Sequence, residues 1–187
     1  MKKKVINDKH KQNLIKTGKI SEKPFKYNGI GFAIDVSFEG LYYAINCGNF
    51  MNFCQNEHDF LDIFKSIREL ICKVSTKDFH KDLIRDKGMK HCHLVEGKTR
   101  ELVVRCIKEE LLRYDGDKNY DDFIQQVFEG EYIYQIGFEG SVRLIGTYDS
   151  IRQVFRVYLM DYHHKIYEDK RRNLMSKKTH KFCPLEK

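Results

Sequence analysis

The side chains best suited to chemistry gather in the C-terminal third of the chain, where arginine, histidine and tyrosine recur over a short stretch. The candidate catalytic residues are Arg143, Arg156, His163, His164 and Tyr167. A histidine titrates near neutral pH, so it can take the proton of an RNA 2′-hydroxyl while another acidic group protonates the leaving 5′-oxygen. Guanidinium groups can hold the extra negative charge on the phosphate. These residue types are the ones that metal-free RNA cleavage requires.

A second set of side chains in the same part of the chain could hold RNA without reacting with it. Its members are cationic or aromatic: Arg152, Tyr162, Lys165, Lys170, Arg171 and Arg172. Cations contact phosphates, and aromatic rings stack on unpaired bases. A structural interpretation also fits, in which tyrosine and histidine at a strand end cover the core and the arginines are solvated. The sequence leaves both interpretations open.

Histidine and cysteine lie close together in two other segments, 91–93 and 180–183. The first reads His-Cys-His, and the second begins with His180 and ends with Cys183. Zinc sites usually combine paired ligands from two places, most often as CxxC or HxxxH pairs, and the sequence contains neither. Three adjacent residues also cannot easily turn all their side chains to one ion. We therefore expect no metal and no cofactor, with a zinc site joining these two segments as the less favoured alternative.

Motifs of the common enzyme classes are absent from the sequence. It contains no GxxxxGK[S/T] phosphate loop, no GxGxxG motif that opens a helix and no GxSxG nucleophile motif. These absences disfavour the usual nucleotide-binding enzymes and serine hydrolases. Whether the chain is an enzyme at all is left open.

Alternating apolar residues predict strands at both ends of the body of the protein. Every second residue is apolar from Ile30 to Phe38 and again from Leu41 to Cys47. The intervening Glu39-Gly40 predicts a tight N-terminal β-hairpin. The same alternation predicts a C-terminal antiparallel β-meander over 132–138, 142–148 and 155–159.

Three to four helices are predicted between the hairpin and the meander. They fall after Asn56, after the capping-box-like sequence Ser75-Thr76-Lys77-Asp78, over about 99–114 and near 119–128. Gly88 is placed to end the second of them. A hairpin, then helices, then a meander is a segregated α+β arrangement.

Charge divides the 187-residue chain into three parts: a basic arm over 1–26, a single α+β domain over 27–168 and a basic tail over 169–187. The net charge is +7, but lysine and arginine are concentrated at the ends, and acids outnumber bases between them. Basic ends can attract a polyanion such as RNA, or they can simply keep a protein soluble.

Cysteine usage and hydropathy indicate where the protein works. The six cysteines follow no disulfide framework, so we expect reduced thiols and a cytoplasmic location. The sequence has no run of 18 apolar residues, so we expect no membrane association.

The order of helices, meander and final histidine- and tyrosine-rich segment resembles the small ribosome-dependent ribonuclease toxins of the RelE/ParE/HigB group. The similarity covers at most residues 57–168, and the matching positions are Arg143, Arg156, His163, His164, Lys165 and Tyr167. It implies a metal-independent endoribonuclease of toxin or phage-defence type, with RNA or the ribosome as target and an antitoxin as protein partner. This chain is longer than members of that family, begins with an extra hairpin and has an acidic body.

A function without catalysis is the alternative. The chain would then be a protein-binding module of a mobile element or defence system, docking its partner through the sheet or the apolar helices. Stable complex formation that survives removal of both basic ends would favour this reading.

Overall fold

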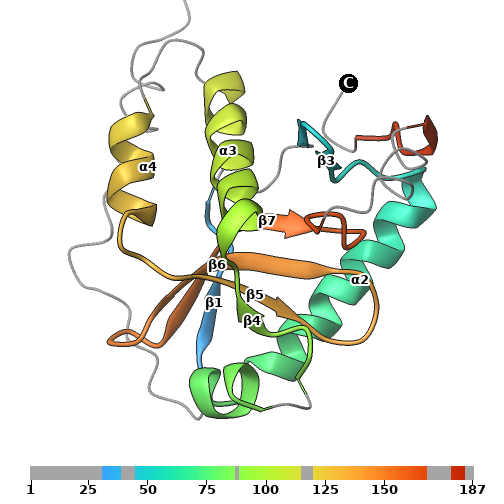
Figure 1. The fold of residues 1–187 in the computed structure, drawn as a ribbon. Coiled ribbons are helices and arrows are strands. Elements are labelled where there is room, and N and C mark those ends of the chain that lie inside the picture. Colours follow the sequence, from blue (N-terminus) through green and yellow to red (C-terminus); the bar gives the residue numbers. More distant parts are fainter. Residues whose placement is uncertain (1–30, 39–44, 87–88, 115–119, 168–177, 184–187) are drawn as a thin grey trace, which may run out of the picture.

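A computed structural model describes residues 31–38, 45–86, 89–114, 120–167 and 178–183 (Figure 1). Within them the fold class is α+β, as the sequence predicted. The elements in chain order are β1 (Ala33–Asp35), β2 (Asn46–Cys47), β3 (Phe50–Met51), α2 (Glu57–Val74), the π-helix η2 (Phe79–Ile84), β4 (His93–Leu94), α3 (Gly97–Tyr114), α4 (Asp121–Phe128), β5 (Ile133–Gly137), β6 (Arg143–Asp149) and β7 (Val154–Asp161).

Five of the strands form one mixed sheet in the order β1-β7-β6-β5-β4. The C-terminal meander is confirmed, because β5 pairs antiparallel with β6 and β6 with β7. A bulge interrupts the register between Ile145 and Gly146. A Cβ at Gly146 would lie 1.8 Å from the carbonyl oxygen of Arg156, so only glycine fits this close approach.

The predicted N-terminal hairpin is wrong in the part of the chain that the structure describes. β1 pairs in parallel with β7, whereas β2 pairs antiparallel with β3 in a separate small sheet. The proposed turn at Glu39-Gly40 lies outside the described residues. Alternation indicates that a segment is a strand, but it does not choose the partner. Here β7 offers a longer and more deeply buried edge, on which Ile34 is in register with Phe155.

The helix predictions are confirmed, with one difference at a cap. Asn56 caps α2 by accepting a hydrogen bond from the backbone N–H of Asp59 at 3.0 Å. The second helix starts at Phe79, because Asp78 accepts from the N–H of Lys81 at 2.7 Å. Asp78 rather than Ser75 is therefore the cap, and the predicted stop at Gly88 lies outside the described residues.

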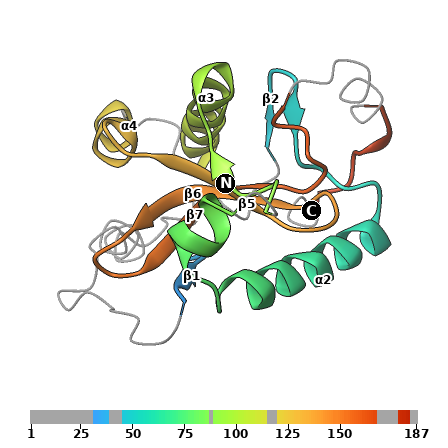
Figure 2. The same cartoon turned by 60° about the horizontal axis from the view of Figure 1, so that its bottom comes forward.

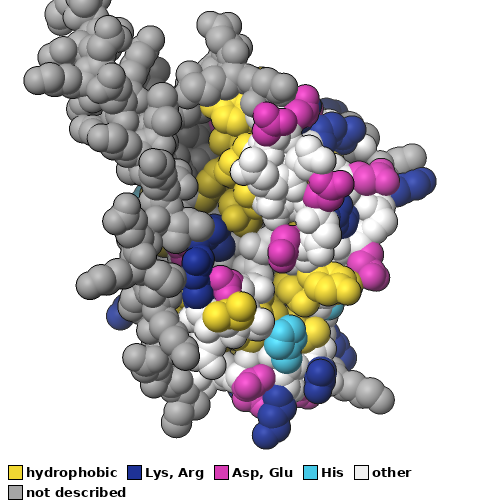
Figure 3. Space-filling view, turned by 90° about the vertical axis from the view of Figure 1, so that its left-hand side faces the viewer, with side chains coloured by type: hydrophobic (Ala, Val, Ile, Leu, Met, Phe, Trp, Pro, Cys, Tyr) yellow, Lys and Arg dark blue, Asp and Glu magenta, His cyan; other side chains and the backbone are white. Residues whose placement is uncertain are grey.

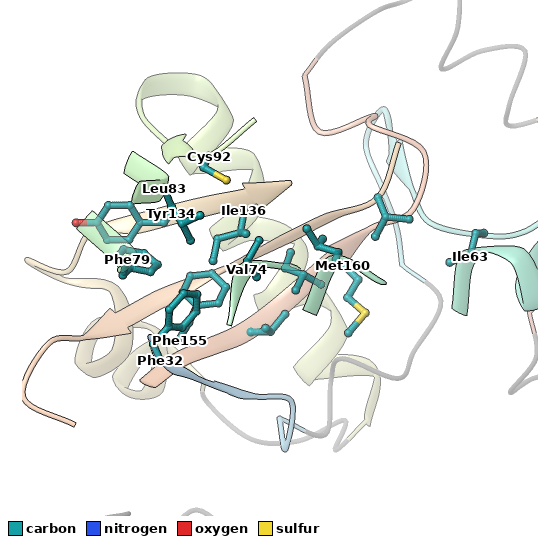
Figure 4. Packing of buried hydrophobic residues seen from close by; sticks show 14 of the residues in the cluster. Phe32, Ile63, Val74, Phe79, Leu83, Cys92, Tyr134, Ile136, Phe155 and Met160 are labelled. Carbon is teal, nitrogen blue, oxygen red and sulfur yellow. The ribbon is translucent and has the colours of Figure 1, made fainter. Parts of the chain in front are cut away.

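Helices cover both faces of the sheet (Figure 2). On one face α2 and η2 pack through Val74 and Phe79 against Phe32 and Phe155 (Figure 4). On the other face α3 and α4 pack against the sheet through residues that include Val103, Cys106, Ile107 and Phe128. The sheet is thus the middle of three layers, and every residue of β5 is buried.

Part of the predicted basic tail lies against the domain. Cys54 and Phe182 exchange two backbone hydrogen bonds, each 2.9 Å long, which hold segment 178–183 beside the start of α2. Among the described residues, no helix is both long and apolar enough to span a membrane.

Candidate functional site

Four aromatic side chains and one arginine meet at the end of the sheet where β5 and β7 stop and β6 begins. This histidine–tyrosine cluster consists of His91, His93, Arg143, His164 and Tyr167. The ring centroids of His91 and His164 are 6.1 Å apart, and those of His164 and Tyr167 are 5.7 Å apart. The rings of His93 and Tyr167 are also separated by 5.7 Å. The cluster therefore joins the segment around β4 to the loop that follows β7.

Strand register brings these residues together. Across the sheet His93 pairs with Gln135, Gly137 pairs with Arg143, and Arg143 pairs with Asp161. Directly paired residues lie on the same face of a sheet, and so do residues two apart along a strand. Ile133, on the same side of β5 as Gln135, packs in the core beneath α3. The cluster therefore lies on the face that α3 covers.

Arg143 places a buried cation beneath the cluster. Its side chain is 2% exposed, and Nη1 donates to the carbonyl oxygens of Gly140 and Val142, both at 2.8 Å. Gly137 makes room for it, because a Cβ there would lie 2.4 Å from Cδ of Arg143. Burial lowers the pKa of Arg143, while Asp161 opposite opposes that shift. A guanidinium stays charged in proteins, so Arg143 supplies a fixed positive potential.

Asp161 organises the loop that carries His164 and Tyr167. Its carboxylate accepts from the N–H of Ile166 at 2.7 Å and from the N–H of His163 at 3.2 Å. The backbone of His164 has φ 56°, a left-handed conformation that residues other than glycine rarely adopt. Such strain persists only where the surroundings enforce it, and it concentrates at functional sites.

The tautomer of His93 follows from its hydrogen bonds. Nδ1 lies 3.0 Å from the carbonyl oxygen of Leu94, an acceptor only, so Nδ1 carries the proton. Nε2 then accepts from the side-chain amide of Gln135 at 3.2 Å, and the hydroxyl of Tyr167 lies 3.3 Å from the same nitrogen. His93 is therefore a neutral imidazole that holds Tyr167 in place.

His91 has the features of a general base. Burial lowers its pKa, and the positive charge of Arg143 lowers it further. Within the described part of the chain, no hydrogen bond engages its ring nitrogens. At neutral pH its imidazole is therefore deprotonated and able to accept a proton.

A hollow of about 430 Å³ lies between α3 and the loop that follows β7. One wall is the first half of α3, with Lys98, Glu101 and Arg105, and another is Lys165 with Ile166. The last two residues lie between His164 and Tyr167 in the chain, but the lining of the hollow contains no side chain of the cluster. Its lining contains more cations than anions. The face drawn in Figure 3 instead has acidic, basic and hydrophobic side chains interspersed.

Of the predicted catalytic residues, the structure brings Arg143, His164 and Tyr167 together. The ring of His163 turns elsewhere, 4.5 Å from that of His180. Arg156 lies further along the sheet and donates to Asp35 at 3.0 Å. Because Arg156 pairs with Thr147, four residues along β6 from Arg143, it lies about 13 Å from the cluster.

The predicted RNA-binding residues are scattered. Arg152 forms an ion pair with Asp149 at the far end of β6. Tyr162 packs in the core on the α2 face, where burial raises its pKa to about 12. Lys165 lines the hollow, although it is 4% exposed. Lys170, Arg171 and Arg172 lie outside the described residues, and the roles of all six stay predictions.

His91, His93 and Gln135 also belong to the site, although they are not among the residues predicted to form it. The sequence feature that could have identified the two histidines is the His-Cys-His triplet. In a strand, its two histidines point to one side and its cysteine to the other. Cys92 is 3% exposed and its Sγ donates to the carbonyl oxygen of Gly137 at 3.1 Å, so both histidines project to the other side. In the described segments His180 lies with Asp59 and His163, so 91–93 and 180–183 do not form a common site.

The fold and the cluster define an α+β protein with a mixed five-stranded sheet between two helical layers and a histidine–tyrosine site at one end. The chain belongs to the family described as Uncharacterised protein UU032, whose profile matches residues 37–187. The matched range contains the whole cluster. No curated protein and no solved structure matches the chain. The resemblance to RelE/ParE/HigB toxins therefore rests on element order and residue character alone.

Proposed function

We propose that this protein binds RNA and cleaves it without a metal ion at the histidine–tyrosine cluster. One observation carries the proposal: the imidazoles of His91 and His164 lie edge to face, with 6.1 Å between ring centroids and 77° between ring planes, near the buried Arg143. Two imidazoles this close can both reach one phosphate group that binds beside them, within the roughly 2.6–3.2 Å of a catalytic hydrogen bond.

His91 and His164 would share the acid–base work. Neutral His91 takes the proton of the 2′-hydroxyl, and the 2′-oxygen attacks phosphorus. The bond from phosphorus to the 5′-oxygen then breaks, and protonated His164 gives its proton to that oxygen. The products are a 2′,3′-cyclic phosphate and a 5′-hydroxyl end. The burial and neighbouring cations that lower the pKa of His91 support its assignment as the base.

The remaining members of the cluster would position the RNA phosphate and stabilise the negative charge that develops on it. Arg143 is too deeply buried to bind a phosphate oxygen directly, so it acts through its positive charge on the developing anion. Tyr167 can donate its hydroxyl to a phosphate oxygen, and His93 holds its ring. The hollow beside α3, with Lys98, Arg105 and Lys165, would take the neighbouring nucleotide. His91 thus replaces His163 in the mechanism that the sequence suggested.

Cleavage of RNA by the purified full chain tests the proposal. Cellular RNA is incubated with the protein, with and without ribosomes and with and without EDTA. We expect cleavage that resists EDTA and is lost in a His91→Ala/His164→Ala variant. A His58→Ala variant, altered at an exposed histidine of α2, should cleave like the unchanged protein. Equal cleavage in all three proteins would refute the assignment of the site.

A protein-binding module of toxin, mobile-element or defence type is the second candidate. The observation that favours it is on α2, where Leu61 is 52% exposed and Phe64 is 59% exposed. Three positions apart, they share one face of the helix, and large apolar side chains exposed together are typical of interaction surfaces. Absence of cleavage under every condition above would place this candidate first.

A further inference from the structure

Three side chains that commonly bind metals converge from segments far apart in the chain. Asp59 is in the first turn of α2, His163 follows β7, and His180 belongs to segment 178–183. Each offers one ligand atom, and these atoms all lie within 4.8 Å of one another. Nε2 of His163 is 4.0 Å from Oδ2 of Asp59. This separation is too long for a hydrogen bond, so these two groups do not satisfy each other directly.

The three groups are largely buried, and each also has a hydrogen-bond partner in a neighbouring segment. The side chain of His163 is 15% exposed and that of Asp59 is 27% exposed, while His180 is 8% exposed. The imidazole rings of His163 and His180 lie close together, with 4.5 Å between their centroids. Buried charged groups in proteins are either paired or bound to a metal ion, and a carboxylate beside two imidazoles is suited to both.

Neighbouring groups orient the three side chains. Asp59 accepts from the backbone N–H of Gln55 at 2.7 Å. Nε2 of His163 donates to the carbonyl oxygen of Phe53 at 3.1 Å, a bond that an ion at this nitrogen would replace. Nδ1 of His180 lies 2.9 Å from Oγ1 of Thr179, and its Nε2 lies 3.4 Å from the side-chain nitrogen of Gln55. Carbonyl and hydroxyl partners of this kind fix the rotation of metal-binding histidines.

We propose that Asp59, His163 and His180 bind one divalent transition-metal ion, Zn²⁺ before others, with water as a fourth ligand. Two imidazoles and one carboxylate are a common donor set for Zn²⁺. With bonds of about 2.0–2.2 Å, tetrahedral ligands lie roughly 3.3–3.6 Å apart, so side-chain shifts of about 1 Å or less close the site.

One nearby charge opposes the ion and another attracts it. Lys165 acts electrostatically on both Asp59 and His163, and burial lowers its own pKa to about 8. The negative charge of Asp161 partly offsets the positive charge of Lys165. The ion would join three segments: 53–59, 161–163 and 178–183. It would thereby hold the C-terminal segment on the domain, beside the backbone pairing of Cys54 with Phe182.

Zinc binding by the full chain tests this site. The protein is freed of metal with a chelator and titrated with zinc chloride, by calorimetry and by thermal unfolding. We expect one equivalent to bind and the unfolding temperature to rise. In Asp59→Asn and His180→Gln variants the affinity should fall by more than about tenfold. The His58→Ala variant, one residue from Asp59 but exposed, should bind zinc unchanged.

A second measurement covers the case in which a variant does not fold. Histidine signals of the unchanged protein are followed by NMR during the same titration, and those of His163 and His180 should shift first. No zinc uptake, equal uptake by the variants, or shifts confined to His91 and His93 would each overturn the proposal. The inference is independent of RNA cleavage, because either property can be found without the other.

Discussion

The hydroxyl of Tyr167 lies 3.3 Å from Nε2 of His93, although 74 positions separate the two residues in the chain. This contact connects the loop after β7 to the short strand β4. No local pattern in the sequence pairs these two segments.

Replacing Tyr167 with phenylalanine removes only the hydroxyl. His93 keeps its bond from Gln135, so the free energy of unfolding should fall by no more than about 1.5 kcal/mol. If the hydroxyl donates to phosphate, RNA cleavage should fall roughly 10–100-fold. The rate of RNA cleavage and the urea unfolding of the variant are compared with those of a Tyr132→Phe variant, because Tyr132 is an exposed tyrosine before β5. Full activity in Tyr167→Phe would remove the hydroxyl from the mechanism.

Replacing Gly137 with alanine should push Arg143 out of its place. The added Cβ would lie 2.4 Å from Cδ of Arg143 and 3.0 Å from Cβ of His91. Overpacking of this kind costs about 1–3 kcal/mol. Urea unfolding of Gly137→Ala, Arg143→Ala and the double variant measures the coupling, and the two losses should not add. Additive losses would mean that the clash does not involve Arg143.

Asp161 should be needed to hold the strained loop. In Asp161→Asn a single side-chain oxygen must serve the N–H groups of both His163 and Ile166. The amide would leave one of them unpaired at a cost of about 1–3 kcal/mol. We expect lower stability and shifted backbone NMR signals over 162–167. Unchanged signals there would show that the carboxylate does not hold the loop.

The low pKa of His91 makes stability depend on pH in a defined direction. Its pKa is lowered in the folded protein, so the unfolded chain binds more protons below the ordinary value of 6.5. His91 therefore contributes stability that is present above pH 6.5 and is lost as the pH falls toward its folded pKa. Urea unfolding between pH 5 and 8 should show this loss, and a His91→Gln variant should show less of it. If the free energy of unfolding changed equally with pH in both proteins, the lowered pKa of His91 would be contradicted.

The sequence anticipated most of the elements and about half of the cluster. Alternation and helical spacing reflect local burial, so β5, β6, β7, α2 and α3 were predictable. Arg143, His164 and Tyr167 were named because their residue types suit the chemistry. His93 belongs to a strand of only two residues, which is too short to leave a pattern in the sequence. Gln135 could not be predicted as a member of the site, because nothing local indicates that the second face of β5 is covered.

By itself, the sequence determined the α+β class, the antiparallel C-terminal meander and the residue types available for acid–base chemistry. These depend on periodicity and composition, which are properties of neighbouring residues. Only the tertiary structure decided that β1 joins β7 in parallel, that His163 turns toward Asp59 and His180, and that the ring of His91 lies edge to face with that of His164. Such choices depend on strand register and on which surfaces bury one another. A shift of one residue in register turns every side chain of a strand to the opposite face, so only the packed fold assembles the site.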